Sequence, residues 1–180
     1  MTTYIALLRG INVGGNHKIR MADLRDLFAM AGCEDVSSYI QSGNVVFTHP
    51  SATADQLAAD LERRIAADTG FDVPVIVRTA AAWAGVVGAN PYPDVEPTSL
   101  HVVFLAVAPS PAAVAAFDAA RFAPEEFTVA GRDVYLYLPD GMGRAKLPPA
   151  LPLIRGTGTA RNWRTVLKLA ELGGDLAARP

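Results

Sequence analysis

The order of apolar segments in the first eighty residues constrains the fold more than any other feature of this sequence. Four segments have the length and composition of β-strands, and they cover residues 3–9, 36–41, 44–48 and 73–77. Two segments with helical spacing separate them, and these stop at Gly32 and Gly70. A capping box of Thr53 and Gln56 opens the second helix. The resulting order, β-α-β-β-α-β, is the split β-α-β pattern of a ferredoxin-like subdomain.

The second half of the chain repeats most of this order after a proline-rich boundary. Residues 88–98 contain three prolines, so we divide the chain there into an N-terminal subdomain, 1–90, and a C-terminal subdomain, 91–180. The elements expected after the boundary are strands at 100–107, 127–130 and 133–138, a short helix after Ser110, a loop over 139–158 and a helix over 160–172. We therefore predict an α+β fold of two tandem ferredoxin-like subdomains, the second an incomplete βαββα copy.

Chain topology predicts that polar groups converge at one edge of the first sheet. In a β-α-β-β-α-β unit the first two strands run parallel, and the third lies antiparallel between them. The carboxyl end of the first strand and the two-residue turn Ser42-Gly43 must then share an edge, and loops at such edges commonly carry function. The candidate ligand-binding residues at this edge are Arg9, Asn12, Gly14, Gly15, Lys18, Gln41, Ser42 and Asn44.

The glycine-rich loop after the first strand has the composition of an anion site. Backbone N–H groups of such loops can point at an anion, and Arg9 and Lys18 would add positive charge. The loop does not match a P-loop, because Lys18 comes two positions late, and the dinucleotide pattern G-x-G-x-x-G is absent. The glycines would serve equally to permit a sharp turn, and both interpretations stay open.

A second wall of the same site is expected at the start of the last helix. Thr159 is a natural N-cap, which would place Arg161 and Arg164 in the first helical turns. A cation there opposes the helix dipole by about 0.3–1 kcal/mol, and a bound anion would relieve this cost. Thr159, Arg161 and Asn162 are therefore candidate ligand-binding residues. In the alternative interpretation Asn162 is a cap and the arginines pair with surface acids.

Composition excludes several classes of function. The longest apolar run is far short of the roughly 20 residues that span a bilayer, no secretion signal precedes Tyr4, and Cys33 is the single cysteine. A cytoplasmic protein without a membrane partner is expected. The three histidines have no metal-ligand spacing, so no metal site is predicted, and the sequence names no cofactor. A net charge of −2 argues against a nucleic-acid binder, although residues 141–170 hold six basic side chains and no acid.

Three motifs together resemble a known bacterial family. They are A-L-L-R-G-I-N-V-G-G at residues 6–15, Y-I-Q-S-G-N-V-V-F at 39–47 and T-A-R-N-W-R-T at 159–165. This combination resembles the family catalogued as domain of unknown function 1697, whose third motif has a second threonine where this chain has Ala160. The resemblance implies an α+β fold of two subdomains in a cytoplasmic bacterial protein. It implies no activity, because the family is uncharacterised.

Three classes of function remain open from the sequence. The first is a protein that binds a small anionic or nucleotide-like ligand between the glycine-rich loop, the Ser-Gly hairpin and the last helix start. The second is a transferase or hydrolase that uses the same cleft, with His17 or a carboxylate from elsewhere as its general base. The third is a nucleic-acid or protein-interaction module that uses the basic segment 141–170. Homodimer formation through exposed strand edges is undecided.

Overall fold

The structure is a computed structural model that describes residues 1–15, 17–154 and 158–178. The chain forms two compact units. The first contains residues 1–85 and the chain end from Lys168, and the second contains Val86–Leu167. Two helices, α3 (Ala80–Gly88) and α6 (Trp163–Ala177), contribute residues to both units. Each unit has one four-stranded antiparallel sheet, which confirms the predicted α+β class.

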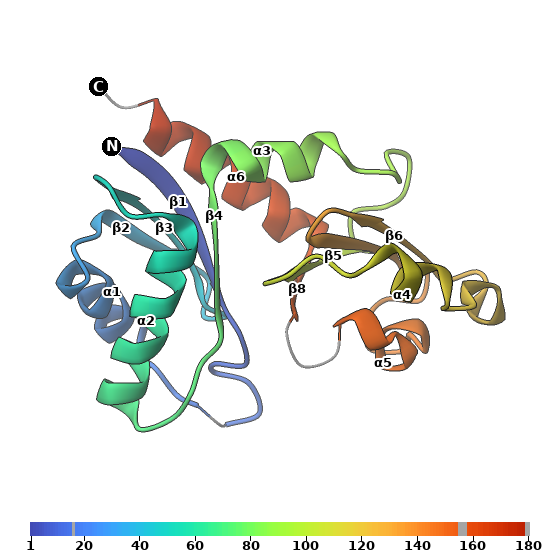
Figure 1. The fold of residues 1–180 in the computed structure, drawn as a ribbon, viewed down its shortest axis with the longest axis horizontal. Coiled ribbons are helices and arrows are strands. Elements are labelled where there is room, and N and C mark those ends of the chain that lie inside the picture. The colour runs from blue at the N-terminus through green and yellow to red at the C-terminus, as the bar shows by residue number, and fades with distance from the viewer. Residues whose placement is uncertain (16, 155–157, 179–180) are drawn as a thin grey trace. The chain divides into compact units, whose positions relative to one another are not determined.

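The first unit has the predicted β-α-β-β-α-β order (Figure 1). Its elements are β1 (Thr2–Leu8), α1 (Met21–Met30), β2 (Glu34–Tyr39), β3 (Asn44–His49), α2 (Ala54–Thr69) and β4 (Val75–Thr79). The strand order is β2-β3-β1-β4, and β3 runs antiparallel to both β1 and β2. The parallel orientation of β1 and β2 that the topological argument requires is therefore present.

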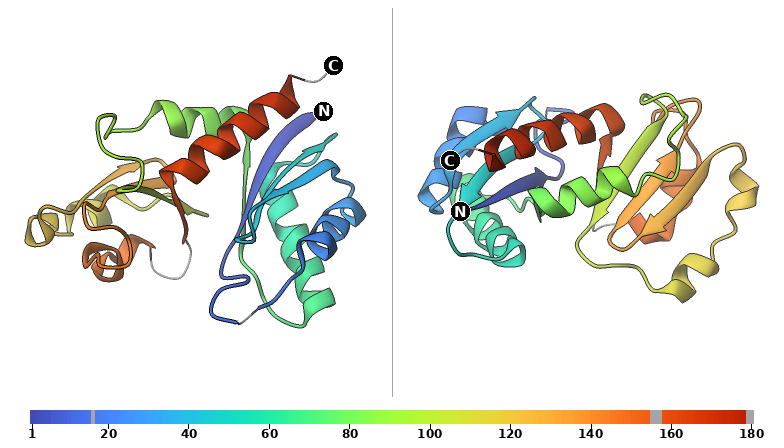
Figure 2. Two further views of the ribbon diagram at one scale, coloured as in Figure 1. Left: turned by 180° about the vertical axis from the view of Figure 1, so that it is seen from behind. Right: turned by 90° about the horizontal axis from the view of Figure 1, so that it is seen from above.

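The alternation of side chains along β1 gives the first sheet two buried faces. Tyr4 lies opposite Phe47 and Ala6 opposite Val45, and these side chains belong to the core beneath α1 and α2. Both helices lie on this one face of the sheet (Figures 1 and 2). The other face is also buried. It contains Ile5, and a Cβ added to Gly173 of α6 would lie 3.1 Å from the Ile5 Cδ1 atom.

The capping box predicted for the second helix is present. The Gln56 backbone N–H donates to the Thr53 hydroxyl at 3.3 Å, and the Thr53 N–H donates to the Gln56 side chain at 2.9 Å. The helix ends at Gly70, which has a left-handed backbone with φ of +77°. These local signals fix α2 at both ends.

The second unit repeats the arrangement of the first. Its elements are β5 (Leu100–Leu105), α4 (Pro111–Ala115), a 3₁₀ turn (Ala119–Phe122), β6 (Glu126–Ala130), β7 (Asp133–Tyr137), α5 (Leu147–Ala150), a 3₁₀ turn (Pro152–Ile154) and β8 (Gly158–Asn162). The strand order β6-β7-β5-β8 has the same connectivity as β2-β3-β1-β4. Two tandem ferredoxin-like subdomains are therefore present, and β8 gives the second one its fourth strand.

The prediction of a helix from residue 160 was wrong at its start. Residues 158–162 form β8, which pairs antiparallel with β5, and α6 begins only at Trp163. Pairing with β5 is a long-range contact that overrides the local capping signal at Thr159. Two smaller differences concern the first hairpin: β2 lies two residues earlier than predicted, and its loop has four residues, 40–43, instead of two.

Candidate ligand-binding site at the edge of the first sheet

The carboxyl end of β1 and the β2–β3 hairpin lie side by side, as the topology predicts. The backbone N–H of Leu8 donates to the Gly43 carbonyl oxygen at 2.8 Å. The side-chain Nδ2 of Asn12 donates to the Gln41 carbonyl oxygen at 3.0 Å. Two independent hydrogen bonds, one from the last residue of β1 and one from the segment after it, therefore join this part of the chain to the hairpin loop.

Gly43 is the position at which this contact tolerates no side chain. Its φ is +74°, which L-residues rarely adopt. A Cβ at Gly43 would lie 2.7 Å from the Leu8 Cβ and 3.0 Å from the Ile11 Cδ1. Both neighbours are buried, so neither can move aside easily. The close approach of the two segments depends on this glycine.

Asn12 holds the glycine-rich loop closed. Its Nδ2 also donates to the Ile19 carbonyl oxygen at 3.0 Å, and its Oδ1 accepts the Ile19 backbone N–H at 3.0 Å. The Asn12 backbone N–H donates to the His17 carbonyl oxygen at 3.1 Å. The polar atoms of the side chain bridge the two ends of the loop and the hairpin, and that Asn12 also contacts a ligand stays a prediction. Asn12 therefore shapes the site.

A pocket of about 490 Å³ lies against this closed loop. Its walls combine cationic, amide and apolar side chains, and the lining residues are Asn12, Gly15, Lys18, Ile19, Arg20, Met21 and Gln41. Four of these residues, Asn12, Gly15, Lys18 and Gln41, were among the sequence candidates. The structure adds Ile19, Arg20 and Met21, which continue the loop into the first residue of α1. The only sequence signal for them was their position directly after Lys18.

The two cations in the lining differ in what they bind. Arg20 makes two hydrogen bonds to the Asp23 carboxylate, at 2.8 and 2.7 Å, which raise the pKa of Arg20 and lower the pKa of Asp23. The Lys18 side chain takes part in no hydrogen bond or ion pair among residues 1–15, 17–154 and 158–178. Lys18 is therefore the cation in this pocket that can meet an anion without breaking an existing pair.

The remaining candidates at this edge lie outside the pocket lining. Asn44 is fully buried, and its Nδ2 donates to the Ser42 hydroxyl at 3.0 Å and to the Tyr39 carbonyl oxygen at 3.1 Å. Ser42 and Asn44 thus brace the hairpin loop. The Arg9 backbone N–H donates to the Pro74 carbonyl oxygen at 3.0 Å, which ties the end of β1 to the segment before β4. Gly14 is exposed beside Gly15.

The candidates Thr159, Arg161 and Asn162 belong to the second unit. The Arg161 side chain is buried, which lowers the pKa of Arg161 to about 10, and its Nη1 donates to the Thr159 hydroxyl at 2.8 Å. Asn162 Oδ1 accepts the Thr165 backbone N–H at 2.8 Å, so Asn162 caps α6. The helix-dipole argument for an anion at Arg161 was wrong, because Arg161 lies on β8. That the three residues contribute to ligand binding stays a prediction.

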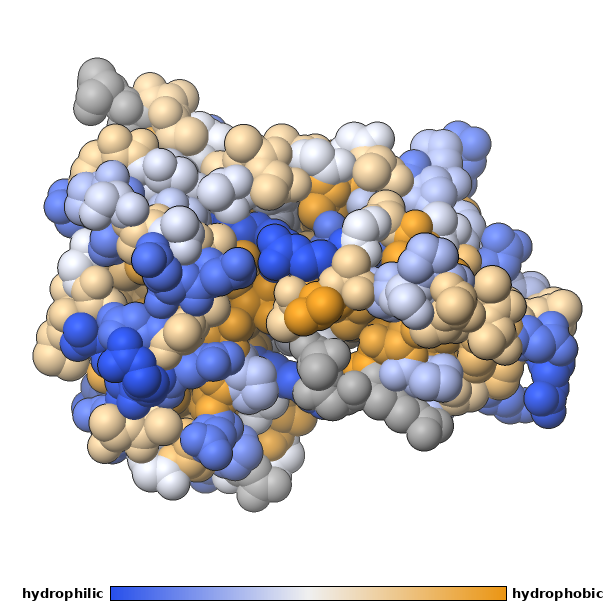
Figure 3. All heavy atoms as spheres, in the orientation of Figure 1, coloured by the Kyte–Doolittle hydropathy of each residue, from blue (hydrophilic) through white to orange (hydrophobic). Residues whose placement is uncertain are grey.

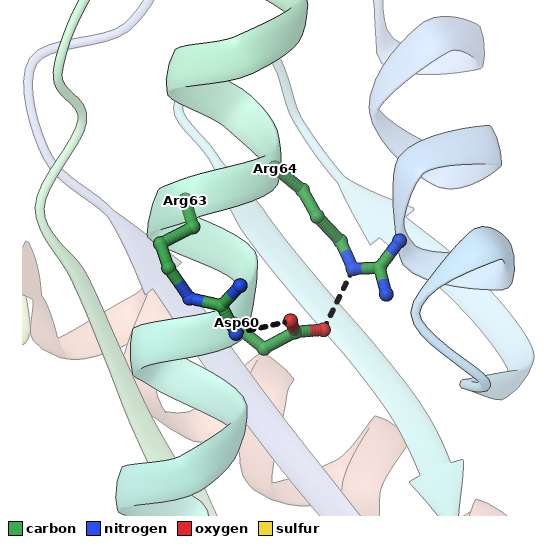
Figure 4. A network of polar contacts seen from close by, with 3 residues as sticks. All are labelled: Asp60, Arg63 and Arg64. Atoms are coloured by element: carbon green, nitrogen blue, oxygen red, sulfur yellow. Dashed lines mark hydrogen bonds and ion pairs between the residues drawn. The ribbon is translucent and has the colours of Figure 1, made fainter.

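Other polar groups of the first unit have structural partners. His17 stacks on Phe71, with ring centroids 4.4 Å apart. Asp60 of α2 accepts from Arg63 and from Arg64, each at 2.7 Å (Figure 4). Hydrophilic side chains gather on this outer surface of α1 and α2 (Figure 3).

Two structural features are absent from the described part of the chain. Within it, no three His, Cys, Asp or Glu side chains are grouped so that they could bind a metal ion. No helix among the described residues is both long and apolar enough to cross a bilayer. Arg155, one of the six basic residues noted in the segment 141–170, lies outside the described residues.

The fold and the site define an α+β protein of two ferredoxin-like subdomains with a polar pocket at the edge of the first sheet. Residues 1–135 match the family described as "Protein of unknown function (DUF1697)", and the chain belongs to this family. A solved structure with the same fold is that of the conserved bacterial protein SP0830 from Streptococcus pneumoniae. It is 25% identical in sequence, the match covers 97% of this chain and 99% of that chain, and the TM-score is 0.79. No curated protein matches the sequence significantly.

Proposed function

We propose that this protein binds a small anionic ligand in the pocket formed by the glycine-rich loop and the first hairpin. The proposal rests mainly on the Lys18 side chain, which lines the pocket and has no partner among the described residues. The Gln41 side chain shares the lining and has no hydrogen bond among the described residues, since the Asn12 side chain binds the Gln41 backbone oxygen. A cation and an amide in the lining of one pocket can bind an anion by charge and by hydrogen bonds.

The backbone conformation of the glycine-rich loop supports a role in ligand binding, beyond that of connecting β1 to α1. Two positions in it, Asn12 and His17, have positive φ although neither is a glycine. Such backbone conformations persist only where surrounding contacts enforce them, and here the Asn12 hydrogen bonds do so. The pocket is therefore preorganised, which lowers the entropic cost of binding.

Thermal denaturation with inorganic phosphate, pyrophosphate and organic phosphates tests this proposal. A ligand present at 100 times its Kd stabilises the folded protein by about 2.7 kcal/mol, which would raise the melting temperature by about 5 to 10 °C. Lys18→Gln should weaken binding about 10- to 100-fold, because one charge-assisted hydrogen bond is lost.

The matched control is Lys146→Gln, which removes the same charge from an exposed lysine of the second unit. It should leave the ligand-induced shift unchanged. If both variants lost the ligand-induced shift in melting temperature equally, the cause would be the change in net charge, and a site at Lys18 would be contradicted. A complete absence of stabilisation by every anion would refute the proposed function.

A further inference from the structure

The residues that lead from the glycine-rich loop into α1 alternate between charged and apolar side chains. Lys18 and Arg20 are exposed, whereas Ile19 is only 6% exposed and Met21 is half-buried. All four residues line the pocket. The exposed cations therefore form the outer part of this wall, and the two apolar side chains form its inner part.

The inner part of this wall is continuous with the core of the first unit. Ile19 belongs to the core cluster beneath α1 and α2, and Met21 packs against that cluster. An apolar group placed against these two side chains would leave water and extend a surface that is already packed. Each methylene group buried in this way favours binding, whereas a polar group there would lose its hydration.

The pocket is also much larger than an inorganic anion needs. Its volume of about 490 Å³ lies within the range of roughly 300–1,000 Å³ that holds drug-sized organic ligands. An inorganic oxyanion at Lys18 would contact the outer part of the wall and leave Ile19 and Met21 uncovered. The order of the lining residues therefore favours a ligand with one charged end and one apolar end.

We infer that the ligand of this pocket is an amphiphilic organic anion, with its charged group at Lys18 and its apolar group against Ile19 and Met21. This inference rests on the proposed function and adds the apolar substituent that the anion carries. The Gln41 amide would donate a hydrogen bond to an oxygen of the charged group. The flexible Met21 thioether adapts to apolar groups of different shapes, so polarity defines the class of ligand.

Isothermal titration with n-alkyl phosphates from methyl to hexyl phosphate tests this inference, because the charged group stays constant along the series. Affinity should rise about 4-fold with each added methylene group until the apolar part of the pocket is filled. Glycerol 3-phosphate is the control ligand, since it has the carbon chain length of propyl phosphate but carries hydroxyl groups. Propyl phosphate should bind about 10-fold or more tightly than glycerol 3-phosphate.

Met21→Gln separates the apolar contact from the anion contact. Glutamine keeps the side-chain length, so methyl phosphate binding should be unchanged, whereas the gain per methylene group should fall below about 2-fold. Met21→Leu keeps an apolar side chain and should retain most of this gain. Lys18→Gln should weaken every member of the series by the same factor and leave the gain unchanged. Met30→Gln is the matched control, since Met30 is 63% exposed at the end of α1 and outside the pocket lining; it should not change binding.

The outcomes that overturn this inference differ from those that overturn the proposed function. If affinity does not rise with chain length, or if propyl phosphate binds no more tightly than glycerol 3-phosphate, the inference is wrong while anion binding at Lys18 stands. A gain per methylene group that Met21→Gln leaves intact would place the apolar contact elsewhere and would also overturn the inference. The comparison of the two ligands uses the unaltered protein, so it decides the inference even if Met21→Gln does not fold. If no compound binds, both proposals fall.

Discussion

Replacing Gly43 by alanine tests the geometry on which the whole site depends. The new Cβ would lie 2.7 Å from the Leu8 Cβ, which is fixed to the backbone of β1, and 3.0 Å from the Ile11 Cδ1. Contacts this short force the hairpin away from β1. The hydrogen bond from the Leu8 N–H to the Gly43 carbonyl oxygen would then lengthen or break.

The loss of unfolding free energy in Gly43→Ala has two parts, and a second variant separates them. Alanine at a left-handed position costs about 1–2 kcal/mol in any surroundings. Overpacking against buried neighbours adds about 1–3 kcal/mol. Gly70 provides the matched control, because its φ of +77° is close to the +74° of Gly43, it lies in the same unit, and a Cβ there meets nothing within 4 Å. Gly70→Ala should therefore show the conformational cost alone.

Urea unfolding followed by circular dichroism measures both free energies. Gly43→Ala should lower the free energy of unfolding by about 2–5 kcal/mol and Gly70→Ala by about 1–2 kcal/mol. If the two losses agree within about 0.5 kcal/mol, the steric argument is refuted, and with it the close approach of loop and hairpin.

Three further predictions concern other parts of the chain. Asn162→Ala should lower the free energy of unfolding by about 1 kcal/mol in urea titrations through loss of the α6 cap. Cys33 is buried, and burial raises the pKa of its thiol from 9.0 to about 11. The thiolate fraction at pH 8 is then about 100-fold smaller, so a thiol reagent should label the native protein far more slowly than the urea-unfolded protein. Asp23→Asn should release Arg20 and tighten anion binding, measured by titration calorimetry. In the wild type Arg20 lowers the Asp23 pKa below 3.8, so the stabilisation from this pair is present above pH 3.8 and is lost as the pH falls through the lower folded-state value.

The connectivity of the first unit could be predicted because its signals are local and its topology has few solutions. Gly32, Gly70 and the capping box set the helix ends, and short connections left one plausible order of strands. That order alone placed the end of β1 beside the hairpin. The hydrogen bonds at Leu8 and Asn12 confirm this placement.

The last strand could not be predicted, because its formation depends on a partner far away in sequence. Residues 158–162 have no apolar alternation, and Thr159 looks like a helix cap. Pairing opposite β5, which buries Thr159 and Arg161, decides their conformation instead. Local propensity is a weak guide wherever such long-range pairing is available.

Within the site, the sequence could supply residue types but not the bonds that each side chain makes. Asn12, Ser42 and Asn44 have the chemistry of ligand contacts, yet their hydrogen bonds close the loop and brace the hairpin. Lys18 is distinguished by its place in the pocket lining together with the lack of a partner among the described residues. A buried amide must satisfy its hydrogen bonds within the fold, whereas an exposed ammonium can remain hydrated until a ligand arrives. The polar side chains that complete the fold around the pocket therefore differ from Lys18 in burial, a property that tertiary structure sets.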